Sequence, residues 1–216
     1  MPIRAPSPIP LSYLAKNGLP TLPFSEWGLG IERPLTIAGP CSAESREQVL
    51  ATAEGIIRRT PQVKVFRAGV WKPRTRPGGF EGVGEAALPW LQEARERTGL
   101  LLMTEVATPQ HVEAALNADI DMLWIGARTT PNPFSVQAIA DALRGTDIPV
   151  FVKNPLNPDL QLWIGALERL AEAGITRMAA IHRGFQWFGN TAYRNDPKWE
   201  FPIRLKAAFP QLELIC

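Results

Sequence analysis

Seven short apolar runs punctuate the chain at fairly regular intervals between residue 35 and residue 216. Most of them are continuously apolar and do not alternate with polar residues. This pattern is typical of strands in a parallel sheet that is covered on both faces. The runs, which we predict to be β-strands, span 35–38, 63–68, 101–105, 122–125, 150–153, 177–181 and 212–216.

The segments between these runs carry the boundary signals of helices. A capping side chain followed by proline stands at Thr108-Pro109, Asn132-Pro133 and Asn157-Pro158, and proline fits there because the first turn of a helix needs no backbone donor. Glycine stands where three helices should end and can adopt the left-handed conformation that closes a last turn: Gly99, Gly145 and Gly174. The predicted helices span 45–59, 85–98, 109–117, 133–143, 158–173 and 200–209.

Strands that alternate with helices define an α/β protein, and right-handed crossovers would make the sheet parallel. A doubly wound sheet requires a glycine-rich phosphate turn after its first strand, but Gly39-Pro40-Cys41-Ser42 contains no such motif. Candidate functional residues instead follow at least five strands, which is typical of a (β/α)8 TIM barrel. We predict an incomplete barrel over 34–216, with about seven strands and six helices, after a proline-rich arm over 1–33.

Composition restricts the class of protein. Of 216 residues, 45% are hydrophobic and 20% are charged, so a globular domain with a substantial core is expected. A net charge of +2 argues against general nucleic-acid binding. Two cysteines are too few for a disulfide framework, and no apolar stretch is long enough to span a bilayer. These features predict a cytoplasmic protein, and the proline-rich arm and several tryptophans predict a homo-oligomer.

Six cations end the predicted strands or follow them within a few residues: Arg67, Lys72, Arg74, Arg128, Lys153 and Arg183. The carboxyl ends of parallel strands in a barrel meet at one rim, so these side chains should converge there. Arginine suits bidentate contacts with phosphate or carboxylate, and lysine supplies a compact charge. Pro73 and Pro77 stiffen the loop after the second strand, which limits the entropy lost when the loop grips a ligand. The sequence therefore predicts a phosphate-binding rim.

Other residues at the same rim admit two interpretations. Cys41 is either a small packed residue or a thiolate that ligates a metal or acts as a nucleophile. Glu105 either balances charge or takes part in the chemistry. His182 is a candidate catalytic group because it can titrate near neutral pH, although a lone loop histidine is usually structural. Gly126 and Ala127 are small, which allows a ligand to approach the backbone.

Six motifs, taken in order, resemble those of one enzyme family. They are GPCSAES at 39–45, KPRTRPGGFEGVG at 72–84, TEV at 104–106, IGARTTPNPFSVQ at 125–137, VKNP at 152–155 and IHRGF at 181–185. From about residue 24 onward the chain resembles the metal-dependent class I 3-deoxy-D-arabino-heptulosonate 7-phosphate (DAHP) synthases, which catalyse the first step of the shikimate pathway and so of aromatic amino acid biosynthesis. The branch that is often fused to a chorismate mutase domain looks most similar.

The resemblance implies a reaction, the aldol-like condensation of phosphoenolpyruvate with erythrose 4-phosphate to DAHP and phosphate. By motif, the residues around phosphoenolpyruvate would be Arg67, Lys72, Arg128, Lys153 and Arg183, with Gly126 and Ala127 also substrate-binding and Lys72 also catalytic. The residues that meet erythrose 4-phosphate would be Lys72, Pro73, Arg74 and Thr75. Glu105 would help to organise the water near the enol carbon. These roles are what the family implies for matching positions of this chain.

The resemblance also implies a divalent metal ion, and Cys41 matches the metal-binding cysteine of the family. Thiolate, imidazole and carboxylate ligands together suit manganese, iron, cobalt or zinc, and the sequence does not distinguish these metals. The family's other ligands, a histidine in a D-P-S-H segment and then a glutamate and an aspartate, have no counterpart before Cys216. We therefore expect a C-terminally truncated synthase domain that is inactive and poorly stable alone, because an open barrel leaves a strand edge unpaired.

Three alternatives stay open. The related 3-deoxy-octulosonate 8-phosphate synthases use arabinose 5-phosphate, although the KPRT form of the loop at 72–75 favours erythrose 4-phosphate. Another phosphate-binding barrel aldolase would use Lys153 as a Schiff base. A non-catalytic remnant would bind phosphoenolpyruvate without metal-dependent turnover.

Overall fold

The computed structural model describes residues 18–31, 33–74, 76–186, 189 and 193–216. Within them, seven parallel strands form one sheet in chain order from β1 to β7. The strands are β1 (Ile37–Ala38), β2 (Val65–Arg67), β3 (Leu101–Val106), β4 (Met122–Ile125), β5 (Val150–Lys153), β6 (Met178–Ile181) and β7 (Glu213–Ile215). All seven predicted strands are confirmed. The sheet has β1 and β7 at its edges, and the architecture is a partial (β/α)8 barrel.

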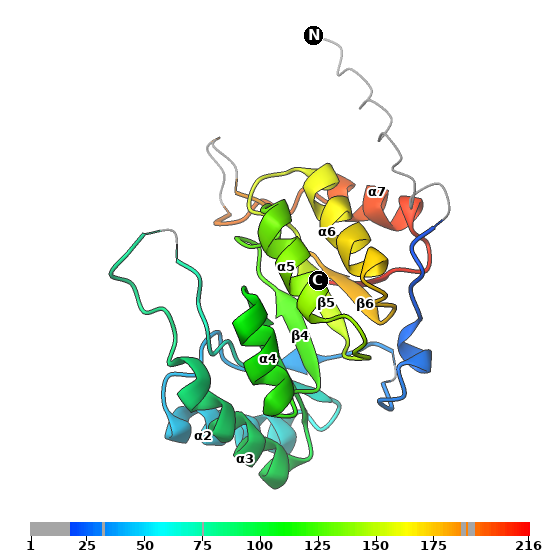
Figure 1. Cartoon of the computed structure of the whole chain (residues 1–216). Helices are drawn as coiled ribbons and strands as arrows, with labels where there is room; N and C mark the ends of the chain where they lie inside the picture. Colours follow the sequence, from blue (N-terminus) through cyan, green and yellow to red (C-terminus); the bar gives the residue numbers. More distant parts are fainter. Residues whose placement is uncertain (1–17, 32, 75, 187–188, 190–192) are drawn as a thin grey trace.

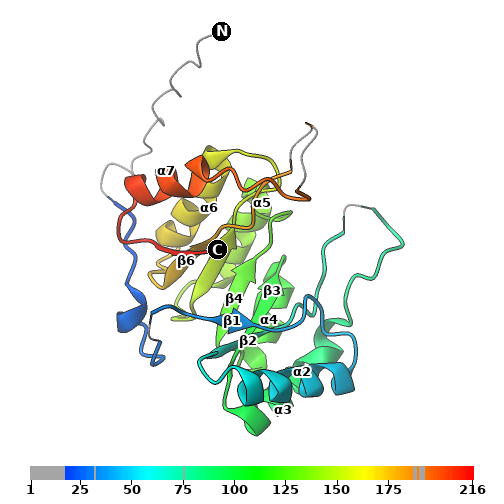
Figure 2. The same ribbon diagram turned by 180° about the vertical axis from the view of Figure 1, so that it is seen from behind.

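Six α-helices connect the strands, as predicted. They are α2 (Arg46–Arg59), α3 (Leu88–Thr98), α4 (Pro109–Asn117), α5 (Pro133–Ala142), α6 (Leu160–Glu172) and α7 (Glu200–Ala208), with short 3-10 helices η1 (Phe24–Glu26) and η2 (Gly84–Ala87). The helices cover one side of the sheet, and the strands are seen from the other side after a half turn (Figures 1 and 2). The longest helix has 14 residues, and none in the described part of the chain could cross a membrane.

Helix boundaries follow local chemistry. The Thr108 side chain accepts a hydrogen bond from the backbone N–H of His111, and Gly99 closes α3 at a φ of 70°, both as predicted. The predicted start of α6 at Asn157-Pro158 is wrong by two residues. Asp159 caps this helix instead, because its carboxylate accepts hydrogen bonds from the backbone N–H groups of Gln161 and Leu162 in the first turn.

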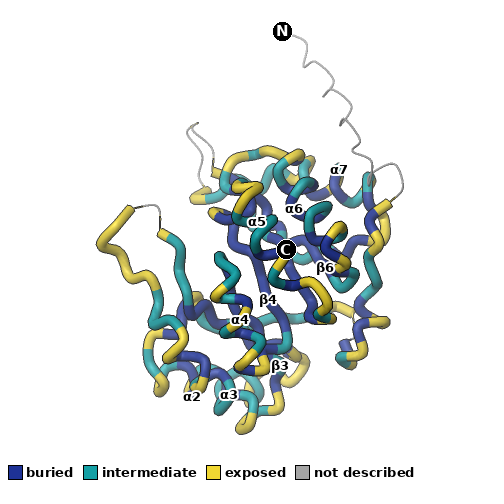
Figure 3. Tube along the Cα trace, in the orientation of Figure 1, coloured by how far each residue is buried: buried dark blue, intermediate teal, exposed yellow. Residues whose placement is uncertain are grey.

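The alternation of side chains along each strand divides the core into two layers. Leu102, Val106, Leu123 and Val152 pack under the helices in the larger cluster. The residues that point to the opposite face form a second cluster inside the curve of the sheet: Val65, Met103, Met122, Trp124, Phe151 and Ala179. The strands are accordingly buried along most of their length (Figure 3). A strand residue two positions after a member of the inner cluster therefore also points into the barrel.

The described end of the N-terminal arm packs against this inner layer. Phe24, Trp27 and Ile31 are buried there, and the Trp27 ring lies edge-on to the ring of Phe151 with centroids 5.5 Å apart. The backbone N–H of Phe24 donates a 3.0 Å hydrogen bond to Oε1 of Glu213. Residues 18–31 therefore stabilise the amino-terminal end of the barrel interior, opposite the predicted site. Residues 1–17 of the predicted arm lie outside the described part.

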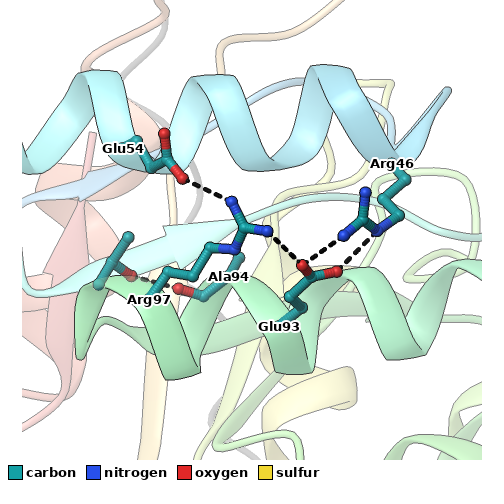
Figure 4. Close-up of polar contacts among 6 residues, drawn as sticks. Arg46, Glu54, Glu93, Ala94 and Arg97 are labelled. Atoms are coloured by element: carbon teal, nitrogen blue, oxygen red, sulfur yellow. Dashed lines mark hydrogen bonds and ion pairs between the residues drawn. The ribbon is translucent and has the colours of Figure 1, made fainter.

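The outer faces of α2 and α3 are joined by a network of ion pairs (Figure 4). The carboxylate of Glu93 accepts hydrogen bonds from Arg46 and from Arg97, and Arg97 also contacts Glu54 at 2.9 Å. Exposed pairs of this kind contribute little to stability, because water and salt screen their charges. The network links the two helices on their solvent side, away from the carboxyl ends of the strands (Figure 4).

Candidate active site

A cavity of about 240 Å³ lies at the carboxyl ends of the strands. Ten predicted site residues line it: Cys41, Arg67, Lys72, Pro73, Arg74, Glu105, Ala127, Arg128, Lys153 and Arg183. Three residues that we did not predict also line it: Leu156, Arg194 and Asn195. Seven cationic side chains thus surround one carboxylate among the described residues. Thr75, predicted to meet the aldehyde substrate, lies outside the described residues.

Strand alternation explains why these side chains meet. Arg67 and Lys153 come two residues after Val65 and Phe151, so they continue the inner face of β2 and β5. Glu105 is in phase with Met103 on β3 and is only 7% exposed. In the sheet Arg67 pairs with Met103 and Glu105 pairs with Trp124, so these charged side chains border the inner apolar cluster at the carboxyl ends of the strands.

The indole of Trp124 on β4 forms a platform beneath two of these cations. The Arg67 guanidinium carbon lies 4.8 Å from the ring centroid, and Nζ of Lys153 lies 4.7 Å from it. Trp124 is 1% exposed, so both cation–π contacts are made in a largely desolvated place where such contacts are strong. Trp124 was predicted only as part of a strand, because its contacts cross from strand to strand.

Lys72 binds two neighbouring elements from the loop after β2. Its Nζ donates a 3.0 Å hydrogen bond to the backbone oxygen of Cys41 and lies 3.6 Å from Oε2 of Glu105. Gly126, a predicted site residue, leaves room for that carboxylate: a Cβ atom there would be 2.0 Å from Oε1 of Glu105. Gly126 therefore acts through its lack of a side chain, beside the cavity and not in its lining.

Gly39 brings the turn after β1 against β2. Its φ is +145°, and a Cβ atom would lie 2.0 Å from the backbone oxygen of Arg67. This approach lets Nη1 of Arg67 donate a 2.9 Å hydrogen bond to the backbone oxygen of Pro40. The contact fixes the guanidinium next to Cys41, at the rim of the cavity.

Burial and the nearby positive charges change the acidity of two groups. Burial is the main cause that lowers the pKa of Lys153 to about 8, with Glu105 acting in the opposite direction and Arg67 adding to the decrease. Burial alone would raise the pKa of the Cys41 thiol, but the charges and hydrogen bonds of Lys72 and Arg67 outweigh it and lower that pKa. The cavity favours negative charge, whether on a ligand or on Cys41.

Arg183 is held from below by Asn154, which follows β5. The backbone N–H of Arg183 donates a 2.7 Å hydrogen bond to Oδ1 of Asn154, and Nδ2 of Asn154 donates to the backbone oxygen of Gly184. Burial, together with the nearby charges of Arg128 and Arg194, lowers the pKa of the Arg183 guanidinium. A bound anion would relieve this repulsion.

His182 was predicted as a catalytic candidate, but the structure does not bring it to the cavity. It continues the outward face of β6 after Ala180, while Arg183 continues the inward face. Its ring lies among those of Trp163, Phe185 and Trp199, with centroids 5.0 to 6.5 Å away, and burial lowers its pKa. His182 is 6% exposed. This environment fits a packed aromatic residue, and we assign it no part in the cavity.

The predicted metal site was tested against the donors that the cavity offers. Within the described residues, no group of three or more histidine, cysteine, aspartate or glutamate side chains could hold a metal ion. Cys41 supplies one thiolate, and a stable site for a divalent transition metal needs three or four donors. The described residues therefore do not form a metal site by themselves.

Comparison with known proteins agrees with the motifs. The model of the DAHP synthetase I family matches residues 27–209. The chain belongs to this family. Phospho-2-dehydro-3-deoxyheptonate aldolase of Thermotoga maritima is 34% identical over 156 residues, which cover 70% of this chain and 43% of that protein. 2-Dehydro-3-deoxyphosphooctonate aldolase of Bordetella petrii is 29% identical over 126 residues, 56% of this chain and 44% of that protein.

Solved structures from the DAHP synthetase I family share the fold. The crystal structure of the Thermotoga maritima DAHP synthase superposes with a TM-score of 0.70 at 28% identity, over 83% of this chain and 50% of that one. A truncated form of the same enzyme gives a TM-score of 0.67, also at 28% identity, over 83% of this chain and 62% of that one. The chain spans less than half the length of the curated relatives that it matches.

Proposed function

We propose that this chain provides the phosphoenolpyruvate site of a DAHP synthase, which condenses phosphoenolpyruvate with erythrose 4-phosphate. The observation that carries the proposal is the meeting of seven cations and one carboxylate in a single cavity at the strand ends. Phosphoenolpyruvate carries a phosphate and a carboxylate on adjacent positions, so it needs several cations from different directions. Membership of the DAHP synthetase I family supports the same substrate.

In the proposed reaction, C3 of phosphoenolpyruvate forms a bond with the aldehyde carbon of erythrose 4-phosphate. Water adds at C2, and inorganic phosphate leaves by cleavage of the C–O bond. Arg67, Arg128, Lys153 and Arg183 would hold the two anionic groups of phosphoenolpyruvate and stabilise the charge that develops. Glu105, held by Lys72, would orient the water.

The loop that carries Lys72, Pro73 and Arg74 would receive the aldehyde substrate. Two hydrogen bonds hold this loop to the residues that follow it. The backbone N–H of Lys72 donates to the backbone oxygen of Glu81 at 2.7 Å, and Nε of Arg74 donates to the backbone oxygen of Phe80. Lys72 and Arg74 are therefore held beside the cavity before a ligand binds. The predicted divalent metal at Cys41, the predicted homo-oligomer and the predicted chorismate mutase domain stay predictions.

The experiment measures release of inorganic phosphate from phosphoenolpyruvate, with the 216-residue chain and with any longer product of the same gene. Erythrose 4-phosphate should support release, whereas arabinose 5-phosphate should not. Preference for arabinose 5-phosphate would support an octulosonate 8-phosphate synthase, in line with the Bordetella relative. Irreversible trapping of Lys153 by borohydride with a carbonyl substrate would support a Schiff-base aldolase. Phosphoenolpyruvate binding without turnover in every form would support a ligand-binding remnant.

A further inference from the structure

Residues 193–196, which follow β6 along the chain, lie beside the residues that directly follow this strand. Phe185 and Asp196 form an isolated antiparallel bridge, with two backbone hydrogen bonds of 2.8 Å between them. Gly184, with a φ of +75°, allows the two arms to approach: a Cβ atom there would be 2.9 Å from the backbone oxygen of Asp196 and 3.1 Å from Cβ of Asn195. Asn195 and Asp196 are therefore fixed against the end of β6.

This contact places two more polar side chains at the cavity. Oδ1 of Asn195 accepts a 2.6 Å hydrogen bond from Nη2 of Arg183, and both Arg194 and Asn195 line the cavity. Arg183 is held at its backbone by Asn154 and at its guanidinium by Asn195, so its direction is determined from two sides. A doubly held arginine is preorganised for an anion, because little side-chain entropy remains to be lost on binding.

Arg194 belongs to the same group of charges as Arg128 and Arg183. Burial and the positive charges of Arg128 and Arg194 lower the pKa of Arg183, so each of these neighbours disfavours the charged form of Arg183. Mutual repulsion is unfavourable in the absence of an anion and is relieved by one. Arg194 is exposed, yet it lines the same cavity as Arg128 and Arg183.

We propose that Arg194 and Asn195 are part of the anion site: Arg194 is a further phosphate-binding residue, and Asn195 is a positioning residue that orients Arg183. The ligand class is a phosphate monoester, bound with Arg128 and Arg183 on the same side of the cavity. This inference rests on the proposed function and extends it by assigning two residues outside the six motifs to the substrate site.

Equilibrium titration with phosphoenolpyruvate and, separately, with inorganic phosphate tests the role of Arg194. Arg194→Gln in the full chain should weaken both anions about tenfold, as expected for loss of one charge-assisted hydrogen bond. Arg58→Gln is the matched control, because Arg58 is exposed on α2, outside the cavity, and its loss changes net charge equally. Equal affinities of the two variants for both anions would overturn the assignment of Arg194.

A double-mutant cycle tests the role of Asn195. If Asn195 acts through Arg183, then Asn195→Ala should weaken phosphoenolpyruvate binding several-fold in the native background and have no further effect in Arg183→Gln. A purely structural role would lower thermal stability in both backgrounds and leave the effects on affinity additive, which would overturn the positioning role.

The same titrations separate this inference from the proposed function. If the wild-type chain and the Arg194→Gln variant bind phosphoenolpyruvate equally well, the result contradicts only the role of Arg194. Wild-type chain that binds neither anion contradicts both.

Discussion

Nζ of Lys72 lies 3.6 Å from Oε2 of Glu105, and the two side chains are 11% and 9% exposed. This pair joins the loop after β2 to the end of β3 across the floor of the cavity. Glu105 is the one carboxylate among the described residues that line it. The pair exists because Gly126, on the neighbouring strand end, has no Cβ atom where the carboxylate lies.

Gly126→Ala should therefore destabilise the protein. The new methyl group would overlap Oε1 of Glu105, and moving the carboxylate would break its pairing with Lys72, at a total cost of about 1–3 kcal/mol. Chemical denaturation would measure the change. Gly55→Ala in α2 is the control: the Cβ would meet no atom within 4 Å, and the substitution should stabilise the helix by about 0.5–1 kcal/mol. Equal effects at both positions would contradict the role of Gly126.

Trp124→Leu should weaken phosphoenolpyruvate binding about tenfold, because it removes the ring that positions both Arg67 and Lys153. Trp124→Phe should retain much of the affinity. Trp27→Leu is the packing control, since Trp27 is equally buried in the inner cluster but packs on the rings of Phe24 and Phe151. Both leucine variants should lower the unfolding temperature, and only the variant at Trp124 should change the affinity.

Phosphoenolpyruvate binding should weaken as the pH rises from 7 to 9. Burial lowers the pKa of Lys153 to about 8, so the empty cavity loses one positive charge in this interval, while the phosphate of the ligand, with a second pKa near ~6, stays doubly ionised. Below pH 8, Lys153 is already protonated when phosphoenolpyruvate binds. Above pH 8, binding of phosphoenolpyruvate makes Lys153 take up a proton. Calorimetry in buffers of different ionisation enthalpy would detect this uptake. Lys153→Arg should remove the pH dependence; its persistence in that variant would assign the effect to another group.

Cys41 should react with iodoacetamide faster than Cys216 at neutral pH. Both thiols are exposed, but Lys72 and Arg67 lower the pKa of Cys41 against the effect of burial, whereas burial raises the pKa of Cys216. Peptide mapping after timed alkylation would give both rates in one sample. Lys72→Met should slow the reaction of Cys41, and Lys64→Met, which removes an exposed lysine elsewhere, should not. Faster alkylation of Cys216 would contradict this electrostatic picture.

The sequence predicted the strands well because a parallel sheet buried on both faces leaves continuous apolar runs. It also predicted that Arg67, Glu105 and Lys153 would meet, since they end strands that share one rim. It failed for His182, where adjacency to Arg183 concealed the alternation that directs neighbouring side chains to opposite faces. His182 comes two residues after Ala180, so its side chain faces outward, toward the helices, as that of Ala180 does. Counting residues along β6 would have shown this.

Other site residues could not be found from local pattern. Trp124 looks like any aromatic residue in a strand, and only the register between β2, β4 and β5 brings its ring beneath two cations. Arg194 and Asn195 lie beyond the last motif, and they reach the cavity through the bridge between Phe185 and Asp196. Such contacts depend on the path of a loop, which hydrophobic periodicity does not determine.

Binding of phosphoenolpyruvate to the 216-residue chain tests the central claim most directly. Calorimetric titration should show saturable binding of one molecule per chain, with a dissociation constant in the range of about 1 μM to 1 mM that is usual for enzyme substrates. Arg183→Gln and Lys153→Met should each weaken it at least about tenfold, and Arg58→Gln should leave it unchanged. Absence of saturable binding, or equal binding by all these variants, would contradict the assignment of this cavity as the phosphoenolpyruvate site.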